Sequence, residues 1–149
     1  DLRRLAGELT AEWVPRARQA GIDLGFEEDG TSPTPAVQGN ALLLREAIAN
    51  LIDNAIRYTG RGASVTVRVR SLGPDAQIEV EDDGPGIAPA LRNKVFDAFT
   101  QLEGGNLPSR RGGRGLGLSF CKVVAHAHDG AIWIEDGCPG AVFCVRLPE

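Results

Sequence analysis

Apolar residues recur along the chain at two different spacings, and each spacing predicts one kind of element. A spacing of about four residues predicts three helices: residues 2–20, ending at Gly21, a second from about Asn40 to Tyr58, and a third from Leu116 to Ala127, stopping at Gly130. The apolar stripe of the first consists of Leu5, Leu9, Trp13 and Ala17. Each helix is therefore expected to bury one side against a common core.

Apolar and polar residues alternate in several shorter segments, a spacing that is typical of half-buried strands. Such segments occur around Leu24, Val37, Val67 and Ile78, and again over residues 131–135 and 142–147. Together they predict about five strands. Helices and strands in this order favour an α/β fold, a two-layer sandwich in which the three helices pack on one face of one sheet.

Composition and charge narrow the class of protein. A chain of 149 residues, 42% hydrophobic and 24% charged, suits a single globular domain, here expected over residues 1–149. The net charge of −4 and the lack of a Lys/Arg-rich run argue against nucleic-acid binding. No apolar run approaches the roughly 20 residues that cross a bilayer, so we expect no direct membrane contact. The chain starts at Asp1 rather than Met, which suggests a piece of a longer protein.

Cysteine and histidine give little sign of a site of their own. Cys121, Cys138 and Cys144 form no C-x-x-C pair, which suits a reducing compartment. A zinc site that combines them with His126 and His128 is disfavoured, because the spacings match no common ligand pattern. The two histidines are expected to be surface or packing residues at the end of the third helix.

The polar face of the second helix is unusual. Its stripe opposite the apolar side consists of Glu46, Asn50, Asp53, Asn54 and Arg57. Asparagine is a poor residue for a helix interior, because its amide competes for backbone hydrogen bonds. Two asparagines one turn apart therefore suggest a ligand face, since amide oxygens suit Mg²⁺, and amide NH₂ groups and arginine suit phosphate. The alternative is a solvated face with two incidental asparagines.

A carboxylate follows the strand around Ile78 on its inward side. Asp82 lies in the same row as Ile78 and Val80, whereas Glu79 and Glu81 point outward. An inward carboxylate is costly unless it is hydrogen-bonded, and the exocyclic amino group of adenine would satisfy it. The Gly84-Pro-Gly86-Ile87 segment that follows would let the backbone approach a flat ligand closely. The alternative is that the strand ends at Glu81 and Asp82 begins a turn.

A glycine-rich run leads into the third helix. Residues 112–118 read Gly-Gly-Arg-Gly-Leu-Gly-Leu, and the free N–H groups at a helix start form a seat for phosphate. The run is neither a Walker A loop nor a G-x-G-x-x-G fingerprint. Leu116 and Leu118 are expected to hold it against the core. The alternative is a disordered linker.

Together, these three stretches resemble the N, G1 and G2 boxes of the Bergerat-type ATP-binding fold. That superfamily comprises sensor histidine kinases, DNA gyrase, heat-shock chaperone ATPases and mismatch-repair ATPases. The N box is matched by residues 46–59, the G1 box by residues 82–87 and the G2 box by residues 113–118. Residues 95–99 resemble the F box, which is typical of the kinases. The resemblance runs from about residue 2 to residue 148 and implies a mixed sheet.

The resemblance assigns a role to each matching position. Asn50 takes the place of the Mg²⁺ ligand, and Asp82 that of the adenine reader. The remaining ATP contacts fall on Asn54, Arg57, Tyr58, Gly84, Gly86, Ile87, Phe99, Gly113, Arg114, Gly115, Leu116, Gly117 and Leu118. Glu46 matches the water-activating base of the hydrolysing branches and is, with Arg57, the candidate catalytic residue. Residues 100–114 take the place of a flexible ATP lid.

What the resemblance implies is a histidine kinase catalytic domain. It would bind Mg-ATP and donate the γ-phosphate to a histidine on an upstream dimerisation domain of a two-component sensor kinase, with a response regulator as the further partner. The resemblance places this domain in the cytoplasmic portion of the sensor, whether or not the parent protein is anchored in a membrane. The isolated domain is expected to be monomeric, the parent homodimeric, and the fragment alone to show little or no autophosphorylation. Alternatives are a serine kinase of the anti-sigma type, an ATPase of the gyrase or mismatch-repair type, and a nucleotide-binding module without turnover.

Overall fold

Five strands and three α-helices make up the described part of the fold, in agreement with the sequence analysis. The computed structural model describes residues 1–28, 36–92, 94–96, 117–137 and 139–149. In chain order the elements are α1 (Leu2–Gln19), β1 (Asp23–Glu28), α2 (Ala41–Thr59), β2 (Ser64–Leu72), β3 (Asp75–Asp82), the 3-10 helices η1 (Pro89–Leu91) and η2 (Lys94–Phe96), α3 (Gly117–Ala127), β4 (Ala131–Asp136) and β5 (Ala141–Pro148).

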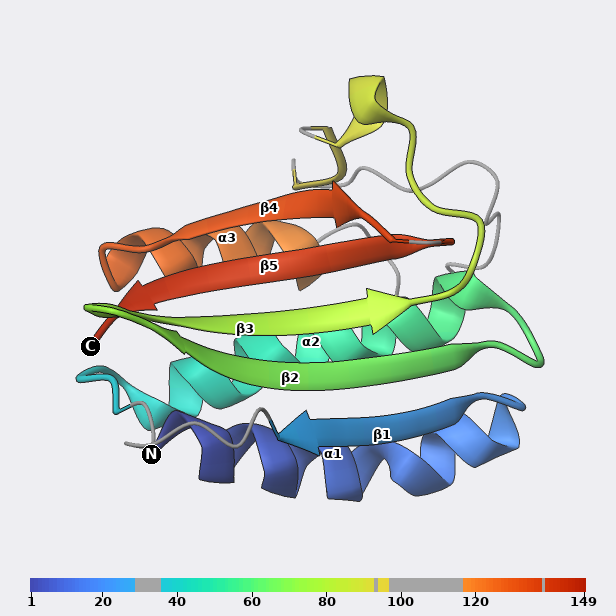
Figure 1. The fold of residues 1–149 in the computed structure, drawn as a ribbon, viewed down its shortest axis with the longest axis horizontal. Helices are drawn as coiled ribbons and strands as arrows, with labels where there is room; N and C mark the ends of the chain where they lie inside the picture. The colour runs from blue at the N-terminus through green and yellow to red at the C-terminus, as the bar shows by residue number, and fades with distance from the viewer. Residues whose placement is uncertain (29–35, 93, 97–116, 138) are drawn as a thin grey trace.

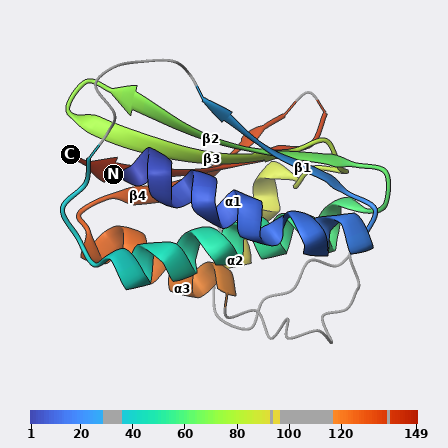
Figure 2. The same ribbon diagram turned by 90° about the horizontal axis from the view of Figure 1, so that it is seen from below.

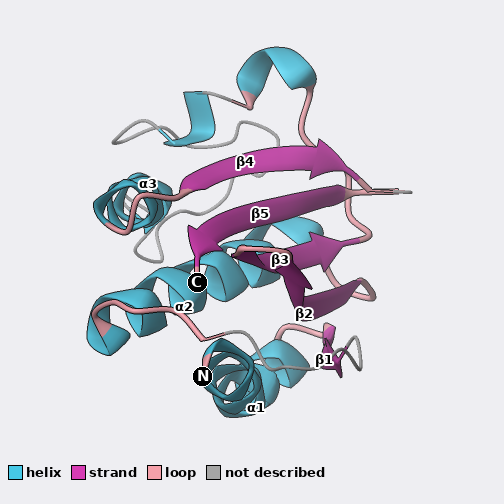
Figure 3. Cartoon of the chain, turned by 60° about the vertical axis from the view of Figure 1, so that its left-hand side comes forward, coloured by secondary structure: helices cyan, strands magenta, loops and turns pink. Residues whose placement is uncertain are grey.

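The strands form one mixed sheet in the order β1-β2-β3-β5-β4 (Figure 1). β1 runs parallel to β2, and every other neighbouring pair is antiparallel. All three helices lie on one face of this sheet, with α2 between α1 and α3 (Figure 2). Figure 3 shows the two layers from the side, with α1 next to β1 and α3 next to β4. The predicted two-layer α/β sandwich is therefore confirmed.

The central helix α2 begins at a side-chain cap and buries the face that the sequence predicts. The carboxamide oxygen of Asn40 accepts the backbone N–H groups of Leu42 and Leu43 at 3.0 and 3.1 Å. This bonding satisfies two of the donors that every helix start leaves free. The residues buried against the sheet and the neighbouring helices are Leu44, Ala47, Ile48, Leu51, Ile52, Ala55 and Ile56.

Helices α1 and α3 both end in a residue with left-handed backbone. Gly21 has this role after α1, with φ of 75°, as predicted. After α3 the left-handed residue is Asp129, with φ of 58°, rather than Gly130. Gly130 comes next, and its N–H donates to the carbonyl of Ala125 at 2.8 Å. A β-carbon at Gly130 would lie 2.1 Å from the carbonyl oxygen of Arg146, so glycine is required there for packing.

The two faces of the sheet differ in chemistry. The inward row across its middle consists of Val67, Val80, Phe143 and Ile134. Glu79 lies on the opposite face, as its alternation predicts, yet it is only 8% exposed. Its carboxylate pairs with Arg68 at 3.5 Å and with Arg70 at 3.1 Å, and these long side chains cover it.

The short strand that was predicted around Val37 is wrong. Residues 36–38 have no regular secondary structure. Val37 instead packs its side chain against the core from the segment that leads to the cap of α2. Three residues later, the backbone N–H of Asn40 donates to Nε2 of His128 at 3.1 Å. Apolar character at this position therefore reflects packing and not participation in the sheet.

Candidate functional site

The second half of α2, the segment after β3 and the start of α3 lie next to one another. A β-carbon at Gly84 would lie 3.0 Å from the Cα of Thr59, so the segment after β3 touches the last turn of α2. A β-carbon at Gly117 would lie 3.7 Å from Cγ of Asn50, so the first residue of α3 lies beside the middle of α2. The structure thus brings together the described parts of the three stretches that the sequence singles out.

Asp82 is a buried carboxylate at the end of β3. It is 7% exposed, and its Oδ1 accepts the N–H of Gly84 at 2.9 Å and, more weakly, the N–H of Ala141 at 3.4 Å. Burial raises the pKa of this carboxyl, and the two backbone hydrogen bonds oppose that shift. Across the described residues, no hydrogen bond is made to Oδ2. One oxygen is therefore held by the protein, and the other can accept a donor from a ligand.

The glycines after β3 make close contacts with the protein itself. Gly84 lies against Thr59, as described above. Gly86 has φ of 77°, and a β-carbon there would lie 3.1 Å from the carbonyl oxygen of Gly140. Gly140 in turn has φ of 97°, and its β-carbon would lie 2.0 Å from the carbonyl oxygen of Asp82. The sequence explained Gly84 and Gly86 by the approach of a ligand, whereas backbone contacts already require glycine here.

The predicted ligand face of α2 is half-buried along most of its length. Asn50, Asn54, Arg57 and Tyr58 are all partly exposed. Arg57 pairs with Asp53, one turn earlier, at 2.9 Å. Burial raises the pKa of the Tyr58 phenol. The side chains of Asn50 and Asn54 form no hydrogen bond to another described residue.

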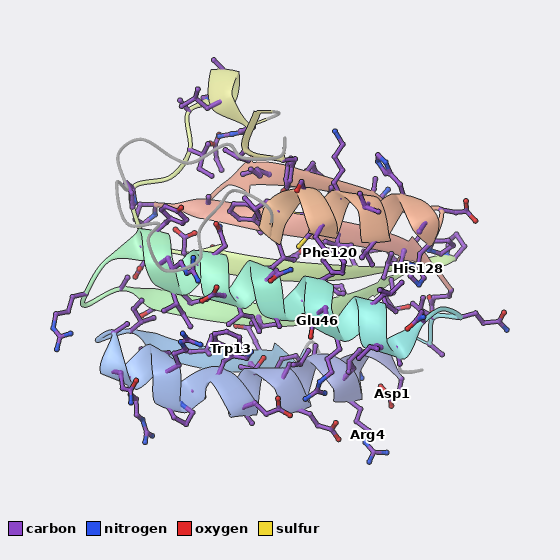
Figure 4. The ribbon with its side chains drawn as sticks, turned by 180° about the vertical axis from the view of Figure 1, so that it is seen from behind. Asp1, Arg4, Trp13, Glu46, Phe120 and His128 are labelled. Carbon is purple, nitrogen blue, oxygen red and sulfur yellow. The ribbon has the colours of Figure 1, made fainter. Side chains whose placement is uncertain are left out.

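Glu46, at the start of that stripe, has different surroundings. Its side chain is exposed on the outer side of α2, between α1 and α3 in the view of Figure 4. The described part of the chain holds no group of three His, Cys, Asp or Glu residues that could bind a metal ion. An amide oxygen is a suitable ligand for a hard cation such as Mg²⁺, so Asn50 is a residue that could hold one.

Comparison with known proteins decides the family. Residues 39–149 match the family of histidine kinase-, DNA gyrase B- and HSP90-like ATPases. The chain belongs to this family. Within it, the sensor-like histidine kinase SenX3 of Mycobacterium tuberculosis (strain ATCC 25618 / H37Rv) is 38% identical over 144 residues, which are 94% of this chain and 34% of SenX3. The chain thus spans about a third of that relative.

Two solved structures extend the similarity to the whole fold. The catalytic domain of histidine kinase ThkA has a TM-score of 0.83 at 28% identity, covering 99% of this chain and 93% of that domain. Full-length ShkA in complex with AMPPNP has a TM-score of 0.82 at 28% identity, covering 99% of this chain and 30% of that protein. The chain is therefore a catalytic, ATP-binding domain of the sensor histidine kinase type.

In this histidine kinase domain, α3 is held against α2 at its start and again near its middle. Gly117 begins the helix beside Asn50, and Leu118 packs partly buried against the core, as predicted. The thiol of Cys121 donates to the carbonyl of Ala47 at 3.2 Å. Other predicted residues lie outside the described part of the chain: Phe99, Gly113, Arg114, Gly115, Leu116 and the lid over residues 100–114.

Several residues near Asp82 were missed by sequence reasoning. Ala141 and Gly140 contact Asp82 from the hairpin between β4 and β5, which the sequence presents only as a turn. Arg92 donates from Nε to the carbonyl of Ile87 at 3.1 Å, and its guanidinium pairs with Asp136 at the end of β4. No local sequence pattern predicts the contacts of Arg92 with Asp136 and of Ala141 with Asp82, because they join positions 44 and 59 residues apart. No described helix is long and apolar enough to cross a membrane.

Proposed function

We propose that this domain binds Mg-ATP and donates the γ-phosphate to a histidine on another domain of the same kinase. Adenine would bind at Asp82, and the phosphates would bind between the second half of α2 and the start of α3. The observation that carries this proposal is that the two carboxylate oxygens of Asp82 have different surroundings. Its Oδ1 accepts backbone N–H groups of the protein, and its Oδ2, which accepts no hydrogen bond from a described residue, suits the exocyclic amino group of adenine. The ShkA complex with AMPPNP supports a nucleotide ligand.

Asn50 is the proposed Mg²⁺ ligand. Its side chain lies beside Gly117, so a cation held by its amide oxygen would be close to the start of α3. Helix starts favour anions, and Mg²⁺ bridges phosphate oxygens during phosphoryl transfer. Arg57 would neutralise phosphate charge after exchanging its pairing with Asp53 for the ligand. Asn54 and Tyr58 would contact phosphate and ribose, and Glu46, although exposed, remains the candidate base.

The phosphate acceptor is proposed to lie outside this chain. His126 is exposed at the end of α3, and both ring nitrogens of His128 are engaged by backbone groups of Asn40 and Val124. A structure of ThkA in complex with the response regulator TrrA, 26% identical to this chain, supports a response regulator as the further partner. An upstream dimerisation domain, in a cytoplasmic portion of a homodimeric kinase, would supply the acceptor histidine.

Asp82→Asn tests the proposal. Asparagine keeps an Oδ1 acceptor for the N–H of Gly84 but presents an NH₂ group where adenine requires an acceptor. We expect ATP binding, measured by calorimetry, to weaken by about 100-fold or more, with the melting temperature unchanged or higher. Asp83→Asn is the matched control, because Asp83 is exposed and its carboxylate, among the described residues, accepts only the N–H of Ser64. Unchanged binding in Asp82→Asn would exclude the adenine role.

A further inference from the structure

The segment after β3 is held at its far end by a residue outside the ATP-binding boxes. Arg92 lies between η1 and η2, and its side chain is 20% exposed. Its Nε–H donates to the carbonyl of Ile87 at 3.1 Å, and its terminal nitrogen pairs with Asp136 at the end of β4. We propose that Arg92 is a positioning residue for nucleotide binding, an inference that rests on the proposed function.

The two ends of the adenine-side loop, residues 84–87, are fixed by different side chains. At the start, Asp82 accepts the N–H of Gly84 at 2.9 Å. At the end, Arg92 donates to the carbonyl of Ile87. The N–H at the start of the loop and the carbonyl at its end are therefore both bonded to side chains, those of Asp82 and Arg92. Each of these two side chains also contacts the hairpin between β4 and β5. Asp82 reaches it through Ala141, and Arg92 reaches it through Asp136.

The other contacts between the loop and the hairpin are weaker. The hydrogen bond from Ala141 to Asp82 is 3.4 Å long, near the limit of useful geometry. Gly86 contributes only a close approach to the carbonyl of Gly140. In the described ranges, the pair of Arg92 and Asp136 is the one ion pair that joins the region after β3 to the hairpin. Loss of this pair would leave the end of the loop held by the partly buried side chain of Ile87 and by the close approach of Gly86 to Gly140.

A loop that is already ordered loses less conformational freedom when a ligand binds, which improves affinity without a direct contact. Arg92 would act in this way on the end of the site that holds the base. Its removal should therefore weaken ATP and ADP binding by the same factor, because both nucleotides carry the same base. Removal of Arg57, which faces the phosphates in the proposed function, should instead weaken ATP more than ADP.

The test compares Arg92→Ala and Arg92→Lys with the wild-type chain, with Kd for ATP and ADP measured by calorimetry. Because the ion pair is partly exposed, we expect a loss of about three- to tenfold for both nucleotides in Arg92→Ala. Arg92→Lys keeps a positive charge opposite Asp136. A lysine ammonium lacks the planar set of N–H groups by which the guanidinium bonds both Asp136 and the carbonyl of Ile87. It should therefore recover only part of the affinity.

Arg45→Ala is the matched control. Arg45 pairs with Glu12 across α1 and α2, and the side chains are 34% and 54% exposed. Its removal should leave both Kd values unchanged, even if it lowers the melting temperature as much as Arg92→Ala does. Equal Kd values in Arg92→Ala and the wild type, at a temperature where both are folded, would overturn the positioning role. A loss larger for ATP than for ADP would also overturn it, because Arg92 would then act on phosphate.

Asp82→Asn in the same assay separates the two proposals. If Asp82→Asn binds ATP as well as the wild type, the proposed nucleotide site itself fails. If Asp82→Asn loses binding while Arg92→Ala keeps it, only the inference about Arg92 fails. If both lose binding in the expected proportions, with Arg45→Ala unaffected, the positioning role of Arg92 is supported.

Discussion

Helix α2 and its cap carry asparagines that the protein uses in two ways. Asn40, at the N-terminus, has its oxygen bonded to the N–H groups of Leu42 and Leu43, and its own N–H bonded to His128. Asn50 and Asn54 lie in the second half of the helix, and their amides bond to no other described residue. The same residue type thus serves the fold at one end and remains available for a ligand at the other.

The difference teaches where stability and function lie along this helix. Polar groups near the N-terminus of α2 and the C-terminus of α3 satisfy one another. The ring of His128 donates from Nδ1 to Val124 at 2.8 Å and accepts the N–H of Asn40 at Nε2, which requires the neutral ring. Near Asp82 and Asn50, by contrast, hydrogen-bonding capacity remains. Residual capacity of this kind is what a binding site requires.

Asn50→Ala should give the largest change in ATP binding if Asn40 serves the fold and Asn50 serves the ligand. The variant loses the proposed Mg²⁺ ligand but no hydrogen bond of the fold. We expect the Mg²⁺-dependent part of ATP affinity to fall by about 100-fold or more, since even partners of metal ligands contribute 10- to 100-fold. Titration with ATP in Mg²⁺ and in EDTA measures it. A wild-type response to Mg²⁺ in Asn50→Ala would break the distinction between the two halves of α2.

A second effect concerns the pH dependence at Asp82. Burial raises the pKa of this carboxyl, and adenine requires the ionised form as acceptor. ATP binding should therefore weaken on acidification at a higher pH than it would with an aspartate of ordinary pKa.

The raised pKa of Asp82 also affects stability, because the folded protein loses stability as the pH rises through that pKa. The melting temperature of Asp82→Asn relative to the wild type should therefore increase between acidic and neutral pH. A constant difference would contradict the burial effect.

Asn40→Ala should change stability and leave binding alone. Loss of a helix cap costs about 1 kcal/mol, and here two N–H groups lose their acceptor. Urea unfolding followed by circular dichroism measures this loss, and the Kd for ATP should stay within the error of the wild-type value. If Asn40→Ala weakened ATP binding as strongly as Asn50→Ala, the two ends of α2 would not be separate in function.

The smallest effect is expected beyond α3. Asp129 has a left-handed backbone that costs an ordinary residue up to about 1 kcal/mol, and glycine removes that cost. Asp129→Gly should raise the free energy of unfolding by roughly 0.5 kcal/mol without changing ATP affinity. Gly130→Ala is the opposite control, because its β-carbon would collide with the carbonyl of Arg146. A destabilised Asp129→Gly would show that the carboxylate has a structural role.

The sequence predicts the helices and most of the strands because their signals are local, and it proposes the ligand-face residues on the same kind of signal. The apolar spacing of α2 and the inward place of Asp82 follow from helix and strand periodicity alone. What escapes prediction depends on partners distant in sequence. The pairing of Arg92 with Asp136, and the approach of Gly140 to Asp82, form only once the sheet has assembled. The strand predicted around Val37 is absent from the structure, because one isolated apolar side chain does not show whether the backbone around it pairs with a neighbouring strand.

The place of β5 in the sheet has a consequence for synthesis of the protein. β5 comes last of the described strands, yet it lies beside β3 and brings the N–H of Ala141 to Asp82. On the ribosome, α2 and β3 would emerge well before the strand that completes their surroundings. A nascent chain should therefore gain its nucleotide affinity abruptly, when β5 leaves the exit tunnel, and a premature stop before β5 should yield a product that holds no nucleotide.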